Sequence, residues 1–243
     1  MATLLLRLEG PMQSWGISSR FGERDTGREP SKSGVVGLLC AALGKPRVED
    51  GADPGRWPTL AVLAGLRMGV RCDRGGTVGV DFQTAGGGRM NGRAYGVAKA
   101  DGSLFPSVMS QRFFLQDASF LVGLCGPDID LLRALHRALA NPMWQLYLGR
   151  KGYVPAVPPW LPDGLRSEDL LEALADYPVA EPSDGQVRLV VEELSPLGAE
   201  PRMDQPVDFV RRRFGRRYVR VDVVSATARD KGGEAFVSQP DVP

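Results

Sequence analysis

The sequence has one histidine, His136, and three cysteines in 243 residues. No cysteine has a second one close by in the chain, and Cys40, Cys72 and Cys125 each stand in an apolar segment. Structural zinc sites need four cysteine or histidine ligands, commonly as closely spaced pairs. We therefore expect no metal, no cofactor and three buried, reduced thiols. A lone histidine also excludes a self-contained histidine pair acting as acid and base in RNA cleavage.

Long apolar runs are also missing. No segment approaches the roughly 20 apolar residues that cross a bilayer, and the opening MATLLLRLEG reaches Arg7 too early for a signal peptide. Hydrophobic residues make up 43% of the chain and charged residues 24%, which is typical of a soluble globular protein. We expect a cytoplasmic protein with no membrane partner.

The net charge is only +1, but the charges are unevenly distributed. Residues 161–176 hold five acids against Arg166, whereas VRRRFGRRYVR at 210–220 holds six arginines and no acid. In an extended strand one face of this tract would carry Arg212, Phe214, Arg216, Tyr218 and Arg220. Such a face can hold phosphates and stack on bases, but a solvated edge strand or a surface for an acidic protein gives the same pattern.

Hydrophobic periodicity predicts a mixed fold. Strands are expected at 3–8, 66–72, 112–124, 187–194 and within 208–224, and helices at 33–43, 57–66, 127–140 and 167–177. Residues 10–16 and 147–162 are expected to be breaks or loops. This order predicts an α+β, elaborated ferredoxin-like domain over residues 1–224, followed by a tail at 225–243.

A glycine-rich segment interrupts this order. Nine glycines fall between Gly75 and Gly102, and a long stretch of this kind in a compact domain is usually functional or mobile. We expect a protruding hairpin or loop at 75–111, with a disordered insertion as the alternative.

The segment EPSKSGVVGLLCAALGK, residues 29–45, resembles a phosphate-binding helix start. It is not a Walker motif, because Lys32 precedes the glycines and does not follow them. Ser31 and Ser33 are candidate caps, and free amide groups, hydroxyls and an ammonium together form a general anion site. Alternatively, a serine caps the helix and nothing binds.

Several motifs occur in series: LLLRLEGPMQSWG, RDTGREPSKSGVVGLLCAALG, QRFFLQDASFLVGL, YLGRKGYVP and DQPVDFVRRRFGRRYV. Together they resemble the CasD (Cas-five) family of CRISPR-associated RAMP proteins, in the form found in type I-E Cascade. The resemblance implies an RRM-like, ferredoxin-like domain with a projecting β-hairpin thumb. It implies a non-catalytic RNA-binding subunit that binds the 5′ handle of the CRISPR RNA and caps the backbone filament, with the CasC backbone subunit and the CasA large subunit as partners.

Carried over by motif, the resemblance also implies RNA contacts for eleven residues. Trp15 would stack on a base or pack beneath the RNA, and Arg89 and Arg93 on the thumb would lie near RNA or the neighbouring backbone subunit. The full set is Trp15, Arg24, Ser31, Lys32, Ser33, Arg89, Arg93, Arg112, Tyr147, Arg150 and Lys151. Where the family often has Ser-Cys after the YLGR segment, this chain has Gly152 and Tyr153.

Two other functions remain open from the sequence. One is a metal-independent endoribonuclease that processes precursor CRISPR RNA, although no Tyr–Lys–His set matches the cutting branch of the family. The other is a ferredoxin-like interaction module whose arginines meet acidic proteins.

Overall fold

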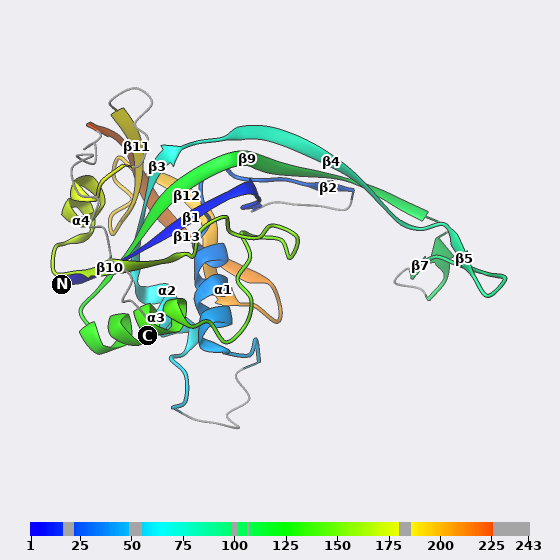
Figure 1. Ribbon diagram of the computed structural model, residues 1–243, viewed down its shortest axis with the longest axis horizontal. Helices are drawn as coiled ribbons and strands as arrows, with labels where there is room; N and C mark the ends of the chain where they lie inside the picture. Colours follow the sequence, from blue (N-terminus) through cyan, green and yellow to red (C-terminus); the bar gives the residue numbers. More distant parts are fainter. Residues whose placement is uncertain (17–21, 49–54, 99–101, 106, 180–185, 226–243) are drawn as a thin grey trace, which may run out of the picture.

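The computed structural model describes residues 1–16, 22–48, 55–98, 102–105, 107–179 and 186–225 (Figure 1). The predicted tail at 225–243 therefore lies, apart from its first residue, outside the described residues. Within the described ranges no helix is both long and apolar enough to cross a membrane.

One large, mainly antiparallel sheet organises the chain. Its principal strand order is β10-β1-β9-β3-β11-β13-β12, and β2 and β4 pair with β9 off this path. The strands of this sheet are β1 (Ala2–Gln13), β2 (Glu23–Arg24), β3 (Arg67–Arg74), β4 (Thr77–Gly86), β9 (Ser107–Gly126), β10 (Trp160–Arg166), β11 (Gln186–Glu193), β12 (Glu200–Asp208) and β13 (Arg213–Ser225). The helices are α1 (Lys32–Leu43), α2 (Leu60–Gly65), α3 (Ile129–Ala140) and α4 (Leu170–Asp176).

The helices cover both faces of the sheet. Because side chains alternate along a strand, β1 sends Leu4 and Leu6 into a core shared with α1, α2 and α3, and Leu5 into a smaller core under α4. Gly69 and Gly123 let α4 approach closely, since a Cβ at either would lie 2.6 or 2.7 Å from a leucine side chain of the helix. The protein is thus a three-layer α+β structure.

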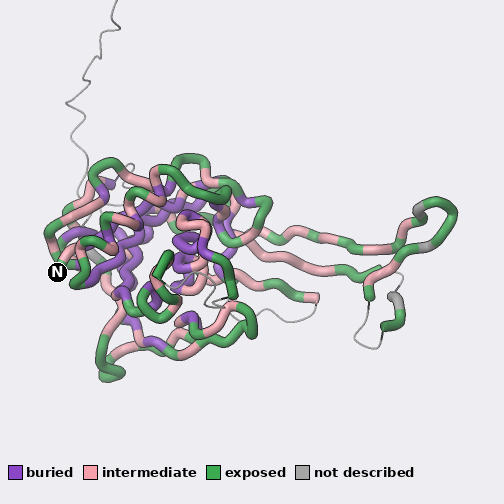
Figure 2. The backbone as a smooth tube through the Cα atoms, turned by 90° about the horizontal axis from the view of Figure 1, so that it is seen from below, coloured by how far each residue is buried: buried purple, intermediate pink, exposed green. Residues whose placement is uncertain are grey.

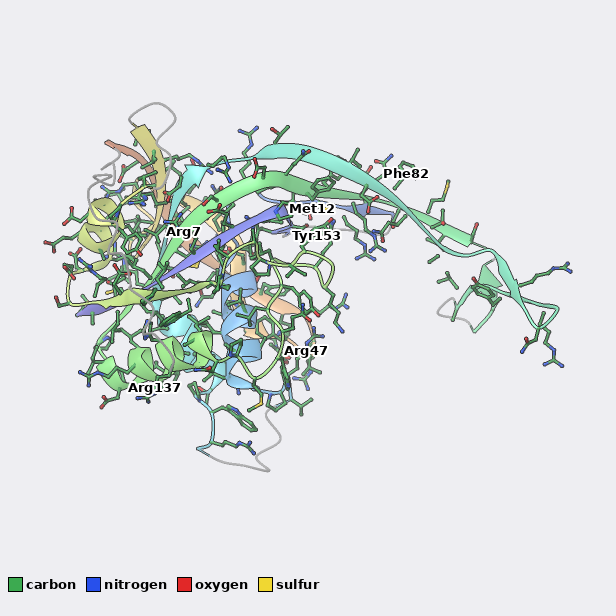
Figure 3. All side chains as sticks on the ribbon, in the orientation of Figure 1. Arg7, Met12, Arg47, Phe82, Arg137 and Tyr153 are labelled. Carbon is green, nitrogen blue, oxygen red and sulfur yellow. The ribbon has the colours of Figure 1, made fainter. Side chains whose placement is uncertain are left out.

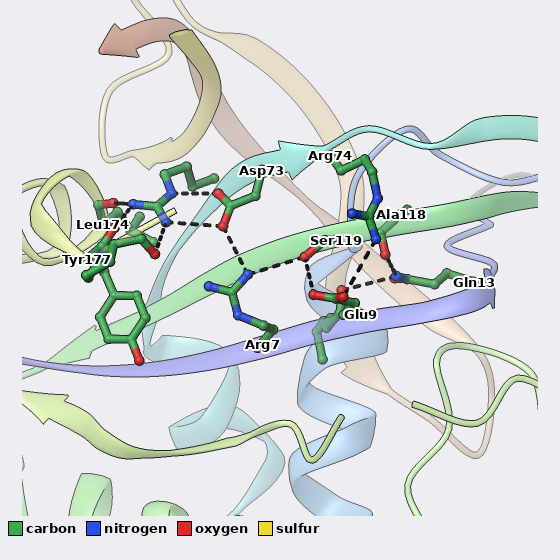
Figure 4. A network of polar contacts seen from close by, with 12 residues as sticks. Arg7, Glu9, Gln13, Asp73, Arg74, Ala118, Ser119, Leu174 and Tyr177 are labelled. Atoms are coloured by element: carbon green, nitrogen blue, oxygen red, sulfur yellow. Dashed lines mark hydrogen bonds and ion pairs between the residues drawn. The ribbon is translucent and has the colours of Figure 1, made fainter. Parts of the chain in front are cut away.

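A buried polar network lies on the α4 face of the sheet (Figure 4). The Arg71 guanidinium donates to Asp73 and to the carbonyls of Leu174 and Tyr177 at the end of α4. Arg7 donates to the same carboxylate at 3.1 Å. Two arginines therefore share one aspartate and fix the end of α4 to the sheet.

Neither terminal strand of the sheet was predicted: residues 147–162 were expected to form a loop, which is wrong for 160–162, and no element was predicted at 195–207. Residues 160–162 fall in β10, and Pro201 and Pro206 fall in β12. Proline cannot donate to a ladder and is therefore confined mainly to edge strands. Both strands lie at the outer ends of the sheet order. At an edge, the missing amide of a proline can face away from the sheet, so no carbonyl of the neighbouring strand loses its hydrogen bond.

Strand β1 is also longer than predicted. It continues through Gly10 and Pro11 to Gln13, which pairs with Leu115 of β9. β10 pairs with β1 only between Thr3 and Leu6, so Pro11 lies where one side of β1 has no ladder partner. This extension carries the GPMQSWG motif to the far end of the sheet.

A two-stranded arm projects from the body (Figures 1 and 2). Strand β4 pairs with the first half of β9, from Thr77↔Gln116 to Gly86↔Ser107. Two short hairpins follow at its far end, one of β5 (Gly88–Met90) and β6 (Arg93–Tyr95), the other of β7 (Val97–Ala98) and β8 (Leu104–Phe105). The arm's described residues are mostly exposed or intermediate, whereas β9 beyond Asp117 is buried.

Candidate nucleic-acid interface

A hollow of about 320 Å³ lies where three motifs of the sequence meet. The start of α1, the end of β1 with the residues after it, and the YLGRK segment each contribute. Its lining residues are Ser14, Trp15, Gly16, Arg24, Asp25, Ser31, Ser33, Gly34, Gly149, Arg150, Phe209 and Phe214. Five of the eleven sequence-predicted residues are among them: Trp15, Arg24, Ser31, Ser33 and Arg150.

Ser31 caps helix α1. Its backbone is extended (φ −75°, ψ 148°) and its hydroxyl accepts from the Gly34 amide at 3.3 Å. Its oxygen also lies 3.4 Å from the Ser33 hydroxyl. Of the two candidate caps, Ser31 therefore forms the cap, and Ser33 presents a half-buried hydroxyl at the edge of the hollow.

Lys32 does not face the hollow. Its side chain is 1% exposed, and its ammonium donates to both carboxylate oxygens of Glu192 at 2.8 and 2.7 Å. Burial lowers the pKa of this ammonium, and Glu192 opposes that effect. This placement contradicts a direct phosphate contact, because an incoming phosphate cannot reach an enclosed, paired ammonium.

A second carboxylate already occupies the helix terminus. Asp204 accepts from the Lys32 amide at 2.8 Å, and Arg217 clamps Asp204 with two hydrogen bonds of 2.7 and 2.9 Å. Glu192 in turn accepts from the Met68 amide at 3.0 Å. The positive end of α1 is thus partly satisfied from within, and the buried pairs fix the helix to β3, β11, β12 and β13.

Trp15 forms the floor of the hollow. It is 2% exposed, and its indole donates to Gln13 at 3.1 Å. A Cβ at Gly34 would lie 2.9 Å from the Trp15 ring, so α1 packs directly on it. Of the two predicted roles for Trp15, this burial favours packing beneath a ligand over stacking on a base.

Arg150 and Arg24 provide the cationic side of the hollow. Arg150 donates to the Tyr153 hydroxyl at 3.0 Å and to the Arg24 carbonyl at 3.1 Å, and its guanidinium lies 5.5 Å from the centre of the Tyr153 ring. These two acceptors are neutral, and they orient the guanidinium. Tyr153, the departure from the family pattern, is the buried support for Arg150.

The rest of the YLGRK segment borders the hollow without lining it. Lys151 is exposed, and Tyr147 is half-buried with its hydroxyl donating to Gln145 at 3.2 Å. Leu146 and Leu148 are buried in the main core. The alternation anchors the segment and leaves its polar side chains at the surface.

The remaining predicted residues lie on the arm. Arg112 lies midway along the arm, opposite Asp81 on β4 and paired in register with Arg24 on β2, and its Nε donates to Ser110 at 3.1 Å. Arg89 and Arg93 are exposed on the β5–β6 hairpin at the far end of the arm. The structure therefore brings five of the predicted residues together at the hollow and places Arg112 along the arm, with Arg89 and Arg93 at its far end.

Sequence reasoning did not identify Phe209 as a site residue, and it placed Phe214 only in the arginine tract. Asp208 accepts from the Val210 and Arg211 amides at 2.8 and 2.9 Å, which forms the turn that brings both rings to the hollow. These hydrogen bonds lower the pKa of Asp208.

The arginine tract is only partly as predicted. Arg216 and Arg220 are exposed while Arg217 and Val219 are buried, in agreement with alternation along β13. Arg212 precedes the strand with a φ of 51°. It therefore lies in the turn and does not belong to the strand face.

The single histidine lies elsewhere. His136 of α3 contacts the Leu161 carbonyl through Nε2 at 2.8 Å, and its ring centre lies 5.6 Å from that of Trp160. It is not among the described residues that line the hollow. The three cysteines are free and buried as predicted.

Known proteins resemble this chain over most of its length. The family described as CRISPR-associated protein (Cas_Cas5) matches residues 3–220. The CRISPR system Cascade subunit CasD of Escherichia coli (strain K12) is 32% identical over 194 residues, covering 76% of this chain and 79% of the relative.

Solved structures agree with this assignment. One described as a crystal structure of a Cas protein has 46% identity and a TM-score of 0.69, and covers 92% of this chain and 95% of its own. A chain of a CRISPR RNA-guided surveillance complex has 34% identity and a TM-score of 0.72, with 92% and 90% covered. The chain therefore belongs to the CRISPR-associated Cas5 family.

Proposed function

We propose that this protein is the non-catalytic subunit that binds the 5′ handle of the CRISPR RNA in a type I-E Cascade complex and caps the backbone filament in antiviral defence. The observation that carries the proposal is the hollow at the start of α1. There Arg24 and Arg150, the Ser33 hydroxyl and the rings of Phe209 and Phe214 line one cavity. Phosphate-binding cations beside aromatic rings are the means by which proteins hold unpaired RNA.

The sheet order supports the predicted fold. The four strands β10-β1-β9-β3 are antiparallel neighbours, α1 follows β1, and α3 connects β9 to β10. This corresponds to the strand–helix–strand–strand–helix–strand order of a ferredoxin-like domain, to which β11, β12 and β13 are added. The arm of β4 and β9 would serve as the thumb, with Arg89 and Arg93 at its tip.

The resemblance of the chain to a subunit of a surveillance complex supports the partners predicted from the sequence, which are the CRISPR RNA and the CasC and CasA subunits. We infer that the handle occupies the hollow, that the CasC backbone subunit meets the arm, and that the CasA large subunit contacts another face. In this proposal the protein assembles with the RNA and the other subunits in the cytoplasm. His136 contributes to helix packing in this proposal and takes no part in chemistry.

The test is a gel with end-labelled, repeat-containing precursor RNA, EDTA and the full-length protein. We expect handle-dependent retention without cleavage, and weaker retention of RNA with a scrambled handle. Arg150→Ala and Arg24→Ala should each weaken binding several-fold and reduce the salt slope by about one unit for each lost phosphate contact.

Arg133→Ala is the matched control, because Arg133 is an exposed arginine on α3 that pairs with Asp130 one turn away. It should leave affinity unchanged. Equal retention of handle and scrambled RNA would overturn handle recognition, and unchanged affinity in the Arg24 and Arg150 variants would remove the hollow from the binding site. A discrete cut in the repeat would replace the proposal with the endoribonuclease.

A further inference from the structure

A rigid aromatic side chain stands exposed at the opposite end of α1 from the hollow. Trp144 is 50% exposed and its neighbour Met143 is 65% exposed. Neighbouring large apolar side chains that are exposed together can form a binding surface. Neither belongs to the hollow or to the arm.

The backbone at this point is firmly held. The Met143 amide donates to the Ala42 carbonyl at 2.9 Å, and the Trp144 amide donates to the Ala41 carbonyl at 3.2 Å. Met143 also packs over Gly44, whose φ of 66° ends α1. Trp144 is therefore displayed by the last turn of α1 and is not on a loose loop.

The chain from Trp144 leads directly to the hollow. This segment runs back along α1 with Leu146 and Leu148 buried in the main core, and it reaches the hollow at Gly149 and Arg150. The helix has 12 residues and is thus roughly 18 Å long, a span of several nucleotides. In Figure 3, Arg47 just beyond the end of α1 and Tyr153 near its start lie on opposite sides of this span.

The charge of this segment favours RNA as its occupant. Residues 141–162 contain no aspartate or glutamate, whereas Arg150 and Lys151 are basic. Within this segment Trp144 and Lys151 are exposed and Tyr147 is half-buried. An aromatic ring and cations in series are the features that hold single-stranded RNA without reading its sequence.

We propose that Trp144 is a stacking site for an RNA base outside the nucleotides held in the hollow, on a path that passes Tyr147 and Lys151. This rests on the proposed function, because the hollow must hold RNA for the path to begin there. The path extends the RNA footprint along α1 and requires no sequence preference at Trp144.

The experiment compares three labelled RNAs on the full-length protein: the handle alone, the handle extended by oligouridine at the 5′ end, and the handle extended at the 3′ end. We expect one extended RNA to bind more tightly, and Trp144→Ala to abolish that gain. The expected loss is about 5-fold or more, while affinity for the handle alone stays unchanged. Trp144→Phe, which keeps a ring, should retain most of the gain, and Trp144→Leu should not.

A second readout is tryptophan emission. Binding of the extended RNA should quench it, and the quenching should be smaller in Trp144→Phe. The control is Leu197→Ala, which removes a side chain that is 91% exposed elsewhere on the surface and should change the affinity for none of the three RNAs.

The outcomes separate the two proposals. If Arg150→Ala weakens binding of all three RNAs and Trp144→Ala weakens none, the stacking site is wrong and the hollow stands. If Arg150→Ala changes the binding of none of them, the proposed function itself fails. If Trp144→Ala and Trp144→Leu leave RNA binding intact but impair assembly with the other subunits, the surface binds protein and the inference is overturned.

Discussion

The Ser14 carbonyl occupies the position that a side chain at residue 149 would need. A Cβ on Gly149 would lie 1.8 Å from the Ser14 oxygen, and Gly149 has a φ of 91°. The Ser14 amide also donates to the Leu148 carbonyl at 3.0 Å. Two motifs more than 130 residues apart in the sequence thus meet backbone to backbone, and this contact places Arg150 beside Ser14.

We therefore expect Gly149→Ala to damage both the fold and the hollow. The new methyl group would collide with backbone, which cannot rotate away as a side chain can, and the positive φ adds strain. Urea denaturation should show a loss of about 2–4 kcal/mol in the free energy of unfolding, together with weaker RNA retention. Gly152→Ala is the matched control, because a Cβ there meets nothing within 4 Å. Equal stability of the two variants would contradict the predicted collision.

Lys32 is expected to act on stability. Lys32→Met leaves the Glu192 carboxylate, only 14% exposed, without its cation, and breaking such a buried pair typically costs about 3–5 kcal/mol. Lys151→Met, at an exposed lysine in the same region, should change the free energy of unfolding by less than about 0.5 kcal/mol.

The double variant Lys32→Met with Glu192→Gln tests the cause. It removes both charges and keeps an acceptor for the Met68 amide, so most of the lost stability should return. A Lys32→Met protein that is fully stable but fails to bind RNA would instead restore Lys32 to the phosphate site.

The central elements of the fold were predictable because their signals are local. Ser31, Asp128 and Gly44 end their helices through contacts within a few residues, and β1 and the second half of β9 contain long buried runs. The edge strands were not predictable in this way. Pro162 and Pro206 argue against a strand in general, and only the completed sheet identifies β10 and β12 as its edges.

The candidate site was also predictable only in part. The motifs indicated which segments meet, and five of the predicted residues line one hollow. What sequence could not supply was the direction of each side chain. Lys32 and Ser33 are adjacent in sequence, yet a helix turns successive residues by about 100°, so one points to Glu192 and the other to the hollow.

The cysteines should be unreactive in the folded protein. Burial raises the pKa of the Cys72 thiol to about 12, an effect that Arg188 partly offsets. An ordinary thiol ionises near 8.5, so the unfolded chain gains thiolate between pH 8 and 10 while folded Cys72 stays protonated. Deprotonation thus favours unfolding, and Cys72 should make the fold less stable as pH rises through this window.

Alkylation followed by mass spectrometry checks this expectation. In urea the labelling rate should rise about tenfold per pH unit below the thiol pKa, and in native buffer Cys72 should remain unmodified at pH 8 and pH 9. Fast native labelling of Cys72 would show that the thiol is not enclosed as the structure places it.

His136 gives the last prediction, because it separates a binding subunit from a nuclease. His136→Asn removes the contact with the Leu161 carbonyl, since the shorter side chain cannot span the gap between α3 and β10, and loses the ring beside Trp160. The expected cost is about 1 kcal/mol in the free energy of unfolding, with handle affinity unchanged.

Handle binding is measured on the same repeat-containing RNA, at a temperature where both proteins are fully folded. If a folded His136→Asn protein loses an RNA-dependent activity, the histidine is catalytic and the purely structural role is rejected. Unchanged RNA retention with a modest loss of stability fits a histidine that only joins α3 to β10.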